Sequence, residues 1–323
     1  MNASWRQSHS RRWRSVAGAT SPDLTRSDAS AEALLRRVEV RVGRRLDGLL
    51  QGERQGRRPG PGGDASLTRA YEPGDDVRWI DWPLTARSVD AMVRVPELEP
   101  VLTAWALVDM SPSMMFGTHG GTKIAQAREV LAAMGVVLRR RGDRLGIAAT
   151  TTGALDLIRP PRGDRRGLVN AVAAVDAMHP DLSAGRTDLA HAITLLGRVA
   201  RHRGMVAIIS DMPWSPGLER AIGGLGRRHD VVVVEIRDRR ERDMPEVGTI
   251  PLRDVETGRT LLVDTSDPAF QARFRAAVAD AEMRRKGMIA RTGARYVAIE
   301  PGRDWLLDMA RALSQGSRRR LAS

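Results

Sequence analysis

The stretch "ALVDMSPSMMFGT", residues 106–118, joins an apolar run of strand length to three polar residues at alternate positions. These three are Asp109, Ser111 and Ser113, and they follow the apolar run directly. A short apolar run bounded by a turn predicts a buried strand. Ligands of α/β proteins bind beside the carboxyl ends of such strands. We therefore predict that this strand delivers three oxygen donors to a ligand-binding edge.

From residue 104 to about residue 300, short apolar segments alternate with longer segments of helical periodicity. This alternation predicts an α/β fold with a doubly wound, mostly parallel sheet of the Rossmann type and right-handed crossovers. The insertion at Thr249–Thr265 is predicted to be a hairpin that turns near Thr257 and Gly258. Strands are predicted at Trp105–Val108, Leu145–Thr150, Val206–Ile209, Val231–Ile236 and Tyr296–Ile299, and helices at Lys123–Arg141, Arg165–Met178, Asp188–Arg203, Leu218–Arg228 and Pro268–Thr292.

Composition shifts along the chain predict four segments. Residues 1–58 form a basic N-terminal tail with one amphipathic helix from Ser27 to about Leu50, since leucines and valines recur there at helical spacing. Residues 59–103 form a small β-containing module that follows a Gly- and Pro-rich linker. Residues 104–313 form the main α/β domain, and residues 314–323 a basic C-terminal tail.

Composition also limits the class of protein. The 323 residues include no cysteine, which excludes disulfides, zinc–thiolate sites and a cysteine nucleophile. No apolar run approaches the roughly 20 residues of a membrane helix, so we expect a cytoplasmic protein. The formal charge of +13 leaves an arginine-rich binder of nucleic acid or of an anionic membrane surface as one alternative. An aromatic content of 4% makes nucleic acid the less favoured partner.

Two further oxygen donors are expected at the edge that holds Asp109, Ser111 and Ser113. Thr187 begins a predicted helix, and Asp211 ends a predicted strand. Five hard oxygen donors from three loops suit Mg²⁺ or Mn²⁺ rather than zinc. Taken one at a time, each residue is equally consistent with a turn or a helix cap. Their coincidence at one edge favours a metal site.

"DMSPS" followed by Thr187 and Asp211 resembles the metal-ion-dependent adhesion site of von Willebrand factor A domains. The resemblance implies that Ser111, Ser113 and Thr187 contact the metal directly or through water. It implies that Asp109 and Asp211 anchor the ion largely through water, while an acidic side chain of a client protein completes the coordination shell.

A second signature, "LTRAYEPGDDVRWIDWPLTAR" at residues 67–87, precedes the predicted sheet. It resembles the signature of the prokaryotic domain of unknown function 58 family. That resemblance extends from about Pro59 to Pro301 and implies a von Willebrand factor A fold and partnership with a MoxR-type AAA+ ATPase. Some members begin with membrane helices, and this chain departs from them. The matching positions, structural or partner-binding, are Tyr71, Gly74, Asp75, Arg78, Ile80, Asp81 and Trp82, with Arg87 close behind.

Motifs for enzymatic chemistry are scarce, so we expect a non-enzymatic adaptor. Neither a His-Glu-x-x-His helix nor a Gly-x-Ser-x-Gly elbow occurs. The segment "GTHGGTKI", residues 117–124, departs from a P-loop at Thr122 and Ile124. A magnesium-dependent hydrolase that uses Asp211 or His119 is the alternative of a different class.

Overall fold

A computed structural model of the chain describes residues 22–56, 67–95, 101–118, 121–180, 187–213, 215–253, 259–300, 305–309 and 311–312. Contacts divide the chain into two compact units, each treated by itself below. One unit comprises the chain up to Gly43 together with Leu102 onward, and the other comprises Arg44–Val101. The predicted C-terminal tail, residues 314–323, lies outside the described residues.

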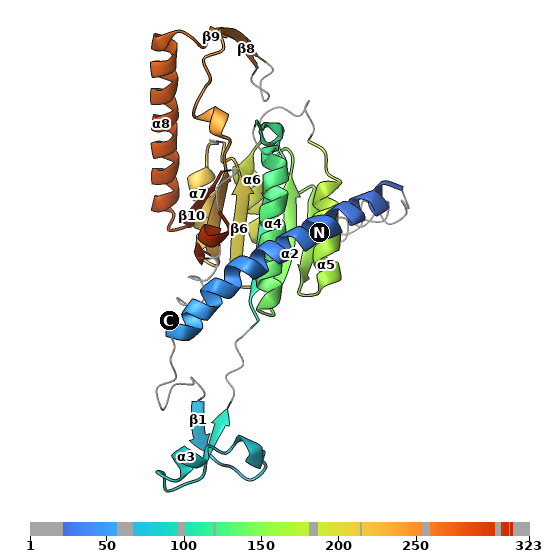
Figure 1. Cartoon of the computed structure of the whole chain (residues 1–323), viewed down its shortest axis with the longest axis vertical. Helices are drawn as coiled ribbons and strands as arrows, with labels where there is room; N and C mark the ends of the chain where they lie inside the picture. The colour runs from blue at the N-terminus through green and yellow to red at the C-terminus, as the bar shows by residue number, and fades with distance from the viewer. Residues whose placement is uncertain are drawn as a thin grey trace, which may run out of the picture. The chain divides into compact units, whose positions relative to one another are not determined.

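The main unit is built on a six-stranded sheet in the order β10-β7-β6-β3-β4-β5 (Figure 1). All neighbouring strands are parallel except β4 and β5. The mixed α/β fold with a mostly parallel central sheet is therefore confirmed. The strands are β3 (Thr103–Asp109), β4 (Arg144–Thr150), β5 (Leu157–Arg162), β6 (Met205–Ser210), β7 (Asp230–Ile236) and β10 (Arg295–Ile299).

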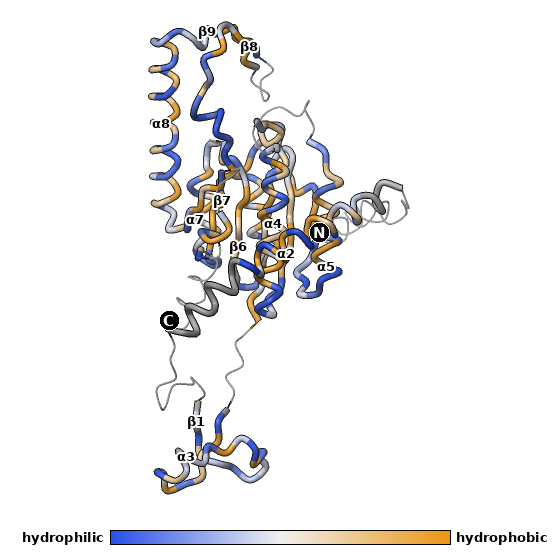
Figure 2. Tube along the Cα trace, in the orientation of Figure 1, coloured by the Kyte–Doolittle hydropathy of each residue, from blue (hydrophilic) through white to orange (hydrophobic). Residues whose placement is uncertain are grey.

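Helices connect these strands and bury the sheet. Side chains of β3, β6 and β7 that include Leu107, Ile208 and Val233 pack in one apolar cluster with residues of α6, α7 and α8. The central strands are accordingly among the hydrophobic parts of the trace (Figure 2), as expected of parallel strands covered by helices. The helices are α4 (Lys123–Arg140), α5 (Arg165–Asp176), α6 (Leu189–Val199), α7 (Leu218–Gly226) and α8 (Pro268–Arg291).

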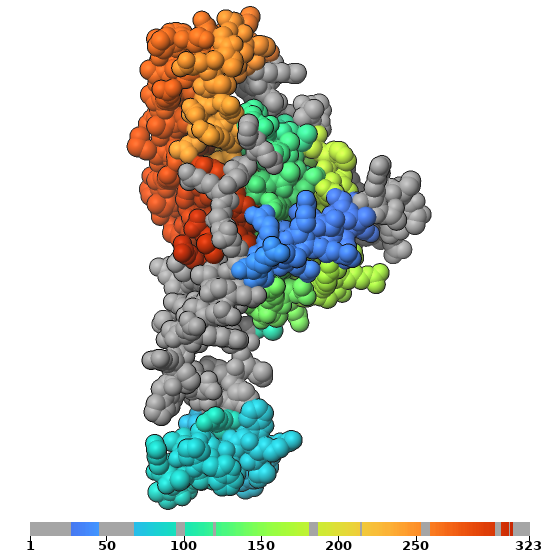
Figure 3. All heavy atoms as spheres, viewed as in Figure 1, coloured from blue at the N-terminus to red at the C-terminus, as the bar shows by residue number. Residues whose placement is uncertain are grey.

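The N-terminal amphipathic helix is α2 (Pro22–Gly56), and its part up to Gly43 lies across α4 and α5 (Figures 1 and 3). Leu35, Val38 and Val42 are buried, and each contributes about 1.5–3 kcal/mol through the apolar area removed from water. The Ser27 hydroxyl donates to the carbonyl of Ala173, 2.8 Å away, at the end where α2 meets α5. By its contacts, the part of this helix from Pro22 to Gly43 belongs to the main unit.

The predicted hairpin is present as β8 (Thr249–Arg253) and β9 (Thr260–Asp264), which pair antiparallel. Its turn lies outside the described residues. Leu261 and Leu262 are 66% and 71% exposed. α8 follows the hairpin and returns the chain to β10 at the edge of the main sheet (Figure 1).

The second unit holds the signature module, in which β1 (Leu67–Ala70) pairs antiparallel with β2 (Met92–Val95). Between these strands lie a 3-10 turn at Val77–Trp79 and a short helix, α3 (Trp82–Thr85). The helix begins after Asp81, whose carboxylate accepts from the backbone N–H of Leu84. The β-containing character expected of this module is therefore present.

None of the described helices is both long and apolar enough to cross a bilayer.

Candidate functional site

The candidate site lies where the strand order reverses. After β3 the chain adds β4 on one side of it, whereas β6 and β7 are added on the other side. Loops that leave β3 and β6 diverge at such a point and open a crevice at the carboxyl ends of the strands. Asp109 is the last residue of β3, and Asp211 directly follows the last residue of β6. The sheet topology therefore brings the two predicted aspartates to one edge.

The loop after β3 is organised around the carboxylate of Asp109, which is fully buried. One of its oxygens accepts from the backbone N–H of Ser111 at 2.9 Å. The other accepts from the hydroxyl of Ser210, at the end of β6, at 2.6 Å. The hydroxyls of Ser111 and Ser113 lie 3.1 Å apart. Three of the five predicted donors are thus gathered in one loop.

Thr187 approaches the same edge from the loop before α6 but contacts a different neighbour. Its hydroxyl donates to the carbonyl of Thr151 at 3.0 Å, just after β4. β4 is paired with β3 so that Thr150 lies opposite Asp109. Thr187 is buried and is tied to the strand end beside Asp109, while its hydrogen bond goes to the backbone rather than to another of the five residues.

Asp211 is paired with a buried lysine that we did not predict as a site residue. The ammonium group of Lys123, whose side chain is 2% exposed, lies 2.6 Å from one carboxylate oxygen of Asp211. It also lies 2.5 Å from a carboxylate oxygen of Glu241, after β7. Lys123 therefore ties the first turn of α4 to the ends of β6 and β7.

The electrostatic balance of the site is set by burial and by these charges. Burial first, and the nearby Asp211 carboxylate second, raise the pKa of Asp109 to about 6. Burial acts to lower the pKa of Lys123, but the two carboxylates outweigh burial, so its pKa is above the ordinary value. The site thus holds the carboxylates of Asp109, Asp211 and Glu241 together with the ammonium group of Lys123, which neutralises their negative charge only in part.

One atom in the site supports a further positive ligand. The second carboxylate oxygen of Asp211 is buried and accepts no hydrogen bond from the described residues. Buried carboxylate oxygens are costly unless paired. Carboxylate and hydroxyl oxygens, such as those of Asp211, Ser111 and Ser113, are hard donors of the kind that divalent cations prefer.

The site differs from carboxylate-rich or histidine-rich metal centres. In the described part of the chain, no three histidine, cysteine, aspartate or glutamate side chains gather to hold a metal on their own. A cation at this edge would depend on hydroxyl ligands as well as on Asp109 and Asp211. His119, the candidate general base of the hydrolase alternative, lies outside the described residues.

The backbone next to Asp211 is strained. Met212 has a φ of 56°, and it is the single non-glycine residue with positive φ among the described residues. A left-handed conformation costs a residue with a side chain about 1–2 kcal/mol. Met212 is also buried, and its backbone N–H donates to the Ser210 hydroxyl at 2.8 Å. That bond links the strained turn to the hydroxyl that holds Asp109.

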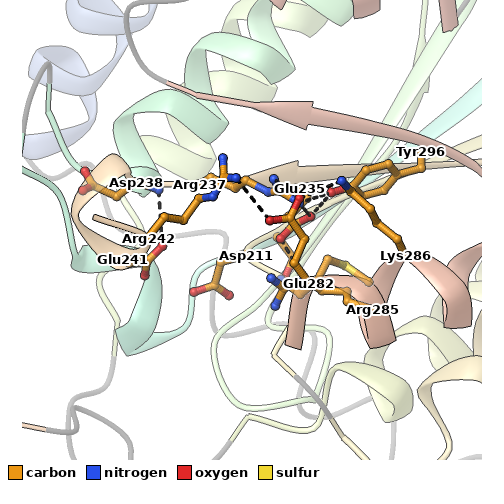
Figure 4. A network of polar contacts seen from close by, with 12 residues as sticks. Asp211, Glu235, Arg237, Asp238, Glu241, Arg242, Glu282, Arg285, Lys286 and Tyr296 are labelled. Carbon is orange, nitrogen blue, oxygen red and sulfur yellow. Dashed lines mark hydrogen bonds and ion pairs between the residues drawn. The ribbon is translucent and has the colours of Figure 1, made fainter. Parts of the chain in front are cut away.

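A network of buried charges adjoins the site on the side of α8 (Figure 4). Glu235 of β7, 1% exposed, is paired with Arg237 at 2.8 Å and with Arg285 at 2.9 Å. The hydroxyl of Tyr296 also donates to Glu235. A cavity of about 300 Å³ is lined by Asp211 as well as by Glu235 and Arg285. The network fixes α8 and β10 against the end of β7.

The signature residues form a separate set of local pairs in the second unit. Asp75 receives two hydrogen bonds from Arg69, at 2.6 and 2.7 Å, and Gly74 before it has a φ of 116°, a conformation that favours glycine. Asp81 pairs with Arg94 at 2.8 Å. The remaining signature residues are arranged as follows: Arg78 pairs with Asp76, Tyr71 and Ile80 are half-buried, and Trp82 and Arg87 are exposed.

Sequence reasoning missed Lys123 and Glu241 because neither belongs to a recognised motif. One signal was available. Lysine occurs only at positions 123 and 286, whereas arginine supplies the other 50 basic residues. A compact ammonium group fits a small gap between two carboxylates, where a planar guanidinium does not. A rare lysine close behind the "DMSPS" loop was therefore a candidate for a buried ion pair.

Comparison with family models finds one match. The family described as "Protein of unknown function DUF58" matches residues 67–284, from β1 into α8. An uncharacterized protein of Mycobacterium tuberculosis is 36% identical over 301 residues, covering 91% of this chain and 92% of the relative. An uncharacterized protein of Mycobacterium avium is 33% identical over 169 residues, covering 51% of this chain and 95% of the relative.

Two solved structures are more distantly similar. The conserved hypothetical protein BatB from Bacteroides thetaiotaomicron aligns with a TM-score of 0.46 at 15% identity, covering 67% of this chain and 99% of that chain. The von Willebrand factor type A protein from Catenulispora acidiphila aligns with a TM-score of 0.32 at 19% identity, covering 42% of this chain and 33% of that chain.

Proposed function

This chain belongs to the DUF58 family, and we propose that it is a non-enzymatic adaptor that binds protein partners through a divalent cation. The observation that supports this proposal is the meeting of Asp109 and Asp211 at the reversal of the strand order, where one buried oxygen of Asp211 has no hydrogen-bond partner among the described residues. Hydroxyl ligands add no charge, so a cation held here keeps much of its attraction for an outside carboxylate. The proposed cation is Mg²⁺ or Mn²⁺, held by Asp109, Ser111, Ser113, Thr187 and Asp211.

The finer fold within this proposal is a doubly wound sheet of the von Willebrand factor A type. In such a sheet the crevice faces solvent at the carboxyl ends of the strands, where a partner can reach it. Met115 and Phe116, which follow the serines, are 46% and 41% exposed. Exposed apolar side chains beside a charged centre are typical of protein interfaces. The exposed tip of the loop therefore suits contact with a protein.

The proposed partner is a MoxR-type AAA+ ATPase, with a client protein that offers an acidic side chain to the cation. The adaptor would act in the assembly or activation of protein complexes, in the cytoplasm or peripherally at a membrane. This part of the proposal rests on the family resemblance of the signature at residues 67–87 and not on a contact in the structure. The exposed Trp82 and Arg87 of that module make it the second candidate surface.

Affinity capture from the native lysate tests the proposal. Wild type is compared with a Ser111→Ala, Ser113→Ala double variant, each in Mg²⁺ and in EDTA, and the exposed Ser266→Ala serves as the control, away from both candidate surfaces. We expect an AAA+ ATPase or its client to be retained only with Mg²⁺ and both serines. Equal retention of the same proteins in EDTA and by the double variant would contradict metal-dependent docking.

A further inference from the structure

A basic groove lies between α6 and α7, on elements that the proposed adaptor site does not use. It has a volume of about 530 Å³. Asp188 marks its end at the start of α6, and it directly follows Thr187 of the candidate metal site. The groove therefore opens beside the loop that carries Thr187, and it extends along two helices.

Arginines dominate the rim of this groove. Arg198 of α6, Arg220 of α7, and Arg227 and Arg228 after α7 all line it, and all four are exposed. Arg228 donates to the backbone carbonyl of Gly197 at 2.6 Å. The other three guanidinium groups form no ion pair with any described residue, and Asp188 is the one carboxylate among the described lining residues.

The arginines of the groove differ from a nearby arginine that has a carboxylate partner. Arg291 of α8 pairs with Glu219 of α7 at 2.8 Å. Four cations with one carboxylate leave a local positive field that attracts an anionic partner. The groove is thus a charged surface whose complement is not supplied by the described part of the chain.

Small residues keep the groove open. Gly197 faces it from α6, and Ala221 and Gly224 face it from α7. A Cβ atom placed on Gly224 would meet no other atom within 4 Å. Ala221, which is half-buried, and Leu225, which is 5% exposed, line the groove beneath the charged rim and give it a small apolar floor.

The two ends of the chain do not have the charge to fill the groove. Residues 1–21 contain four arginines and no acidic residue, and residues 314–323 contain three arginines and no acidic residue. These two basic segments therefore do not supply the complementary charge. An apolar floor below separated cations suits a peptide that carries both acidic and apolar side chains better than it suits a continuous phosphate backbone.

We infer that the α6–α7 groove binds an acidic segment of a protein partner, with carboxylates on the arginine rim and apolar side chains on the Ala221 and Leu225 floor. This contact needs no metal ion. The contact would hold a partner beside the candidate metal site whether or not a cation is bound there. The inference can therefore be tested separately from the proposed adaptor mechanism.

Fluorescence anisotropy with a labelled peptide tests the inference on the full-length protein. The probe is a peptide of about twelve residues that combines Asp and Glu with leucines, and its Asn/Gln counterpart is the control peptide. We expect binding of the acidic probe with a Kd below about 0.5 mM, no change in EDTA, and weakening by roughly tenfold between low and physiological salt.

Two variants locate the binding. The affinity for the acidic peptide should fall at least about tenfold in a triple variant that carries Arg198→Glu, Arg220→Glu and Arg227→Glu. Gly224→Leu fills the groove without a charge change and keeps a good helix former in α7, so it should weaken binding as well. The control variant, Arg166→Glu, Arg273→Glu, Arg275→Glu, makes the same charge change at exposed positions on α5 and α8 and should bind like wild type.

Absence of binding to wild type would overturn the inference, as would equal losses in the groove and control variants. Tighter binding of a single-stranded oligonucleotide that the groove variants abolish would also overturn it, because the ligand would then be a phosphate backbone. In a further outcome, the acidic peptide binds in EDTA while the capture experiment shows no dependence on Mg²⁺. That result would support this inference and contradict the proposed function.

Discussion

The ammonium group of Lys123, at the first turn of α4, lies 2.6 Å from the carboxylate of Asp211, which follows β6. The pair joins two segments that are 88 residues apart and ends at the same sheet edge as Asp109. Lys123 occupies one oxygen of Asp211, and the other oxygen has no hydrogen-bond partner among the described residues, which leaves it available to the proposed cation. The ion pair and the candidate metal site are therefore one electrostatic unit.

Replacing Lys123 by methionine should destabilise the metal-free protein by about 3 kcal/mol, because Asp211 is left as a buried charge with no counter-ion. Saturating Mg²⁺ should recover part of this loss, since a bound cation takes over the neutralisation of Asp211. Chemical denaturation of both proteins with and without Mg²⁺ measures the two effects.

Lys286→Met is the matched control, since Lys286 is 51% exposed and pairs with Glu282 on the surface of α8. An exposed pair of this kind contributes about 0–1 kcal/mol. Equal losses of unfolding free energy in the two lysine variants would contradict the electrostatic link between Lys123 and the site. Equal stabilisation of the two variants by Mg²⁺ would contradict it as well.

Asp109→Asn should raise the stability of the metal-free protein at pH 7 by about 1–3 kcal/mol. Burial raises the pKa of Asp109 to about 6, above its unfolded value of 3.8. The native state therefore binds this proton more tightly than the unfolded chain does. The ionised carboxylate costs stability progressively as the pH rises from about 4 to 6, and the asparagine variant avoids that cost.

Denaturation of wild type and Asp109→Asn at pH 7 and at pH 4 gives the check. The gain should be largest at pH 7 and small at pH 4, where the wild-type carboxyl is already mostly protonated in the native state. A variant that is equally destabilised at both pH values would show that Asp109 contributes to stability through its hydrogen bonds alone.

Glu282→Gln should reduce stability at pH 7 by about 1 kcal/mol, a value lowered to allow for solvent screening. The hydrogen bond from Lys286, together with Arg237, lowers the pKa of Glu282 to about 2. Its contribution is therefore present above the unfolded pKa of 4.5 and is lost as the pH falls toward 2. The difference between variant and wild type should narrow steadily from pH 5 to pH 3 in denaturant titrations; a constant difference would contradict the pairing.

Mg²⁺ should raise the melting temperature of wild type and leave that of the Ser111→Ala, Ser113→Ala variant unchanged. A ligand that binds the native state alone adds RT ln(1 + [L]/Kd), or about 2.7 kcal/mol at 100 times its Kd. Differential scanning calorimetry across a Mg²⁺ series measures the shift. Equal shifts in both proteins would place the cation elsewhere.

Much of the sheet could be predicted because its strands are short, continuous apolar runs. All five predicted strands and all five predicted helices of the main unit are present, with ends that differ by a few residues. β5 was missed because Pro160 and Pro161 lie within it. Proline is tolerated there since β5 is the edge strand and its outer backbone groups need no partner.

The candidate site was only partly predictable. Asp109 and Asp211 meet because parallel strands share one carboxyl edge, a consequence of topology that the sequence pattern already contains. Lys123 and Glu241 depend on how α4 and the loop after β7 pack together, and no local pattern encodes that contact. The direction of the Thr187 hydroxyl, toward Thr151, is likewise a tertiary detail.

The most direct test is isothermal titration of Mg²⁺ into wild type and into the Asp109→Ala and Ser111→Ala variants, with Ser88→Ala as control. The proposed site predicts one cation bound per chain by wild type and by the control, with affinity lost in both site variants that remain folded. Undiminished one-to-one binding by the site variants, or none by wild type, would contradict a divalent cation held at the ends of β3 and β6.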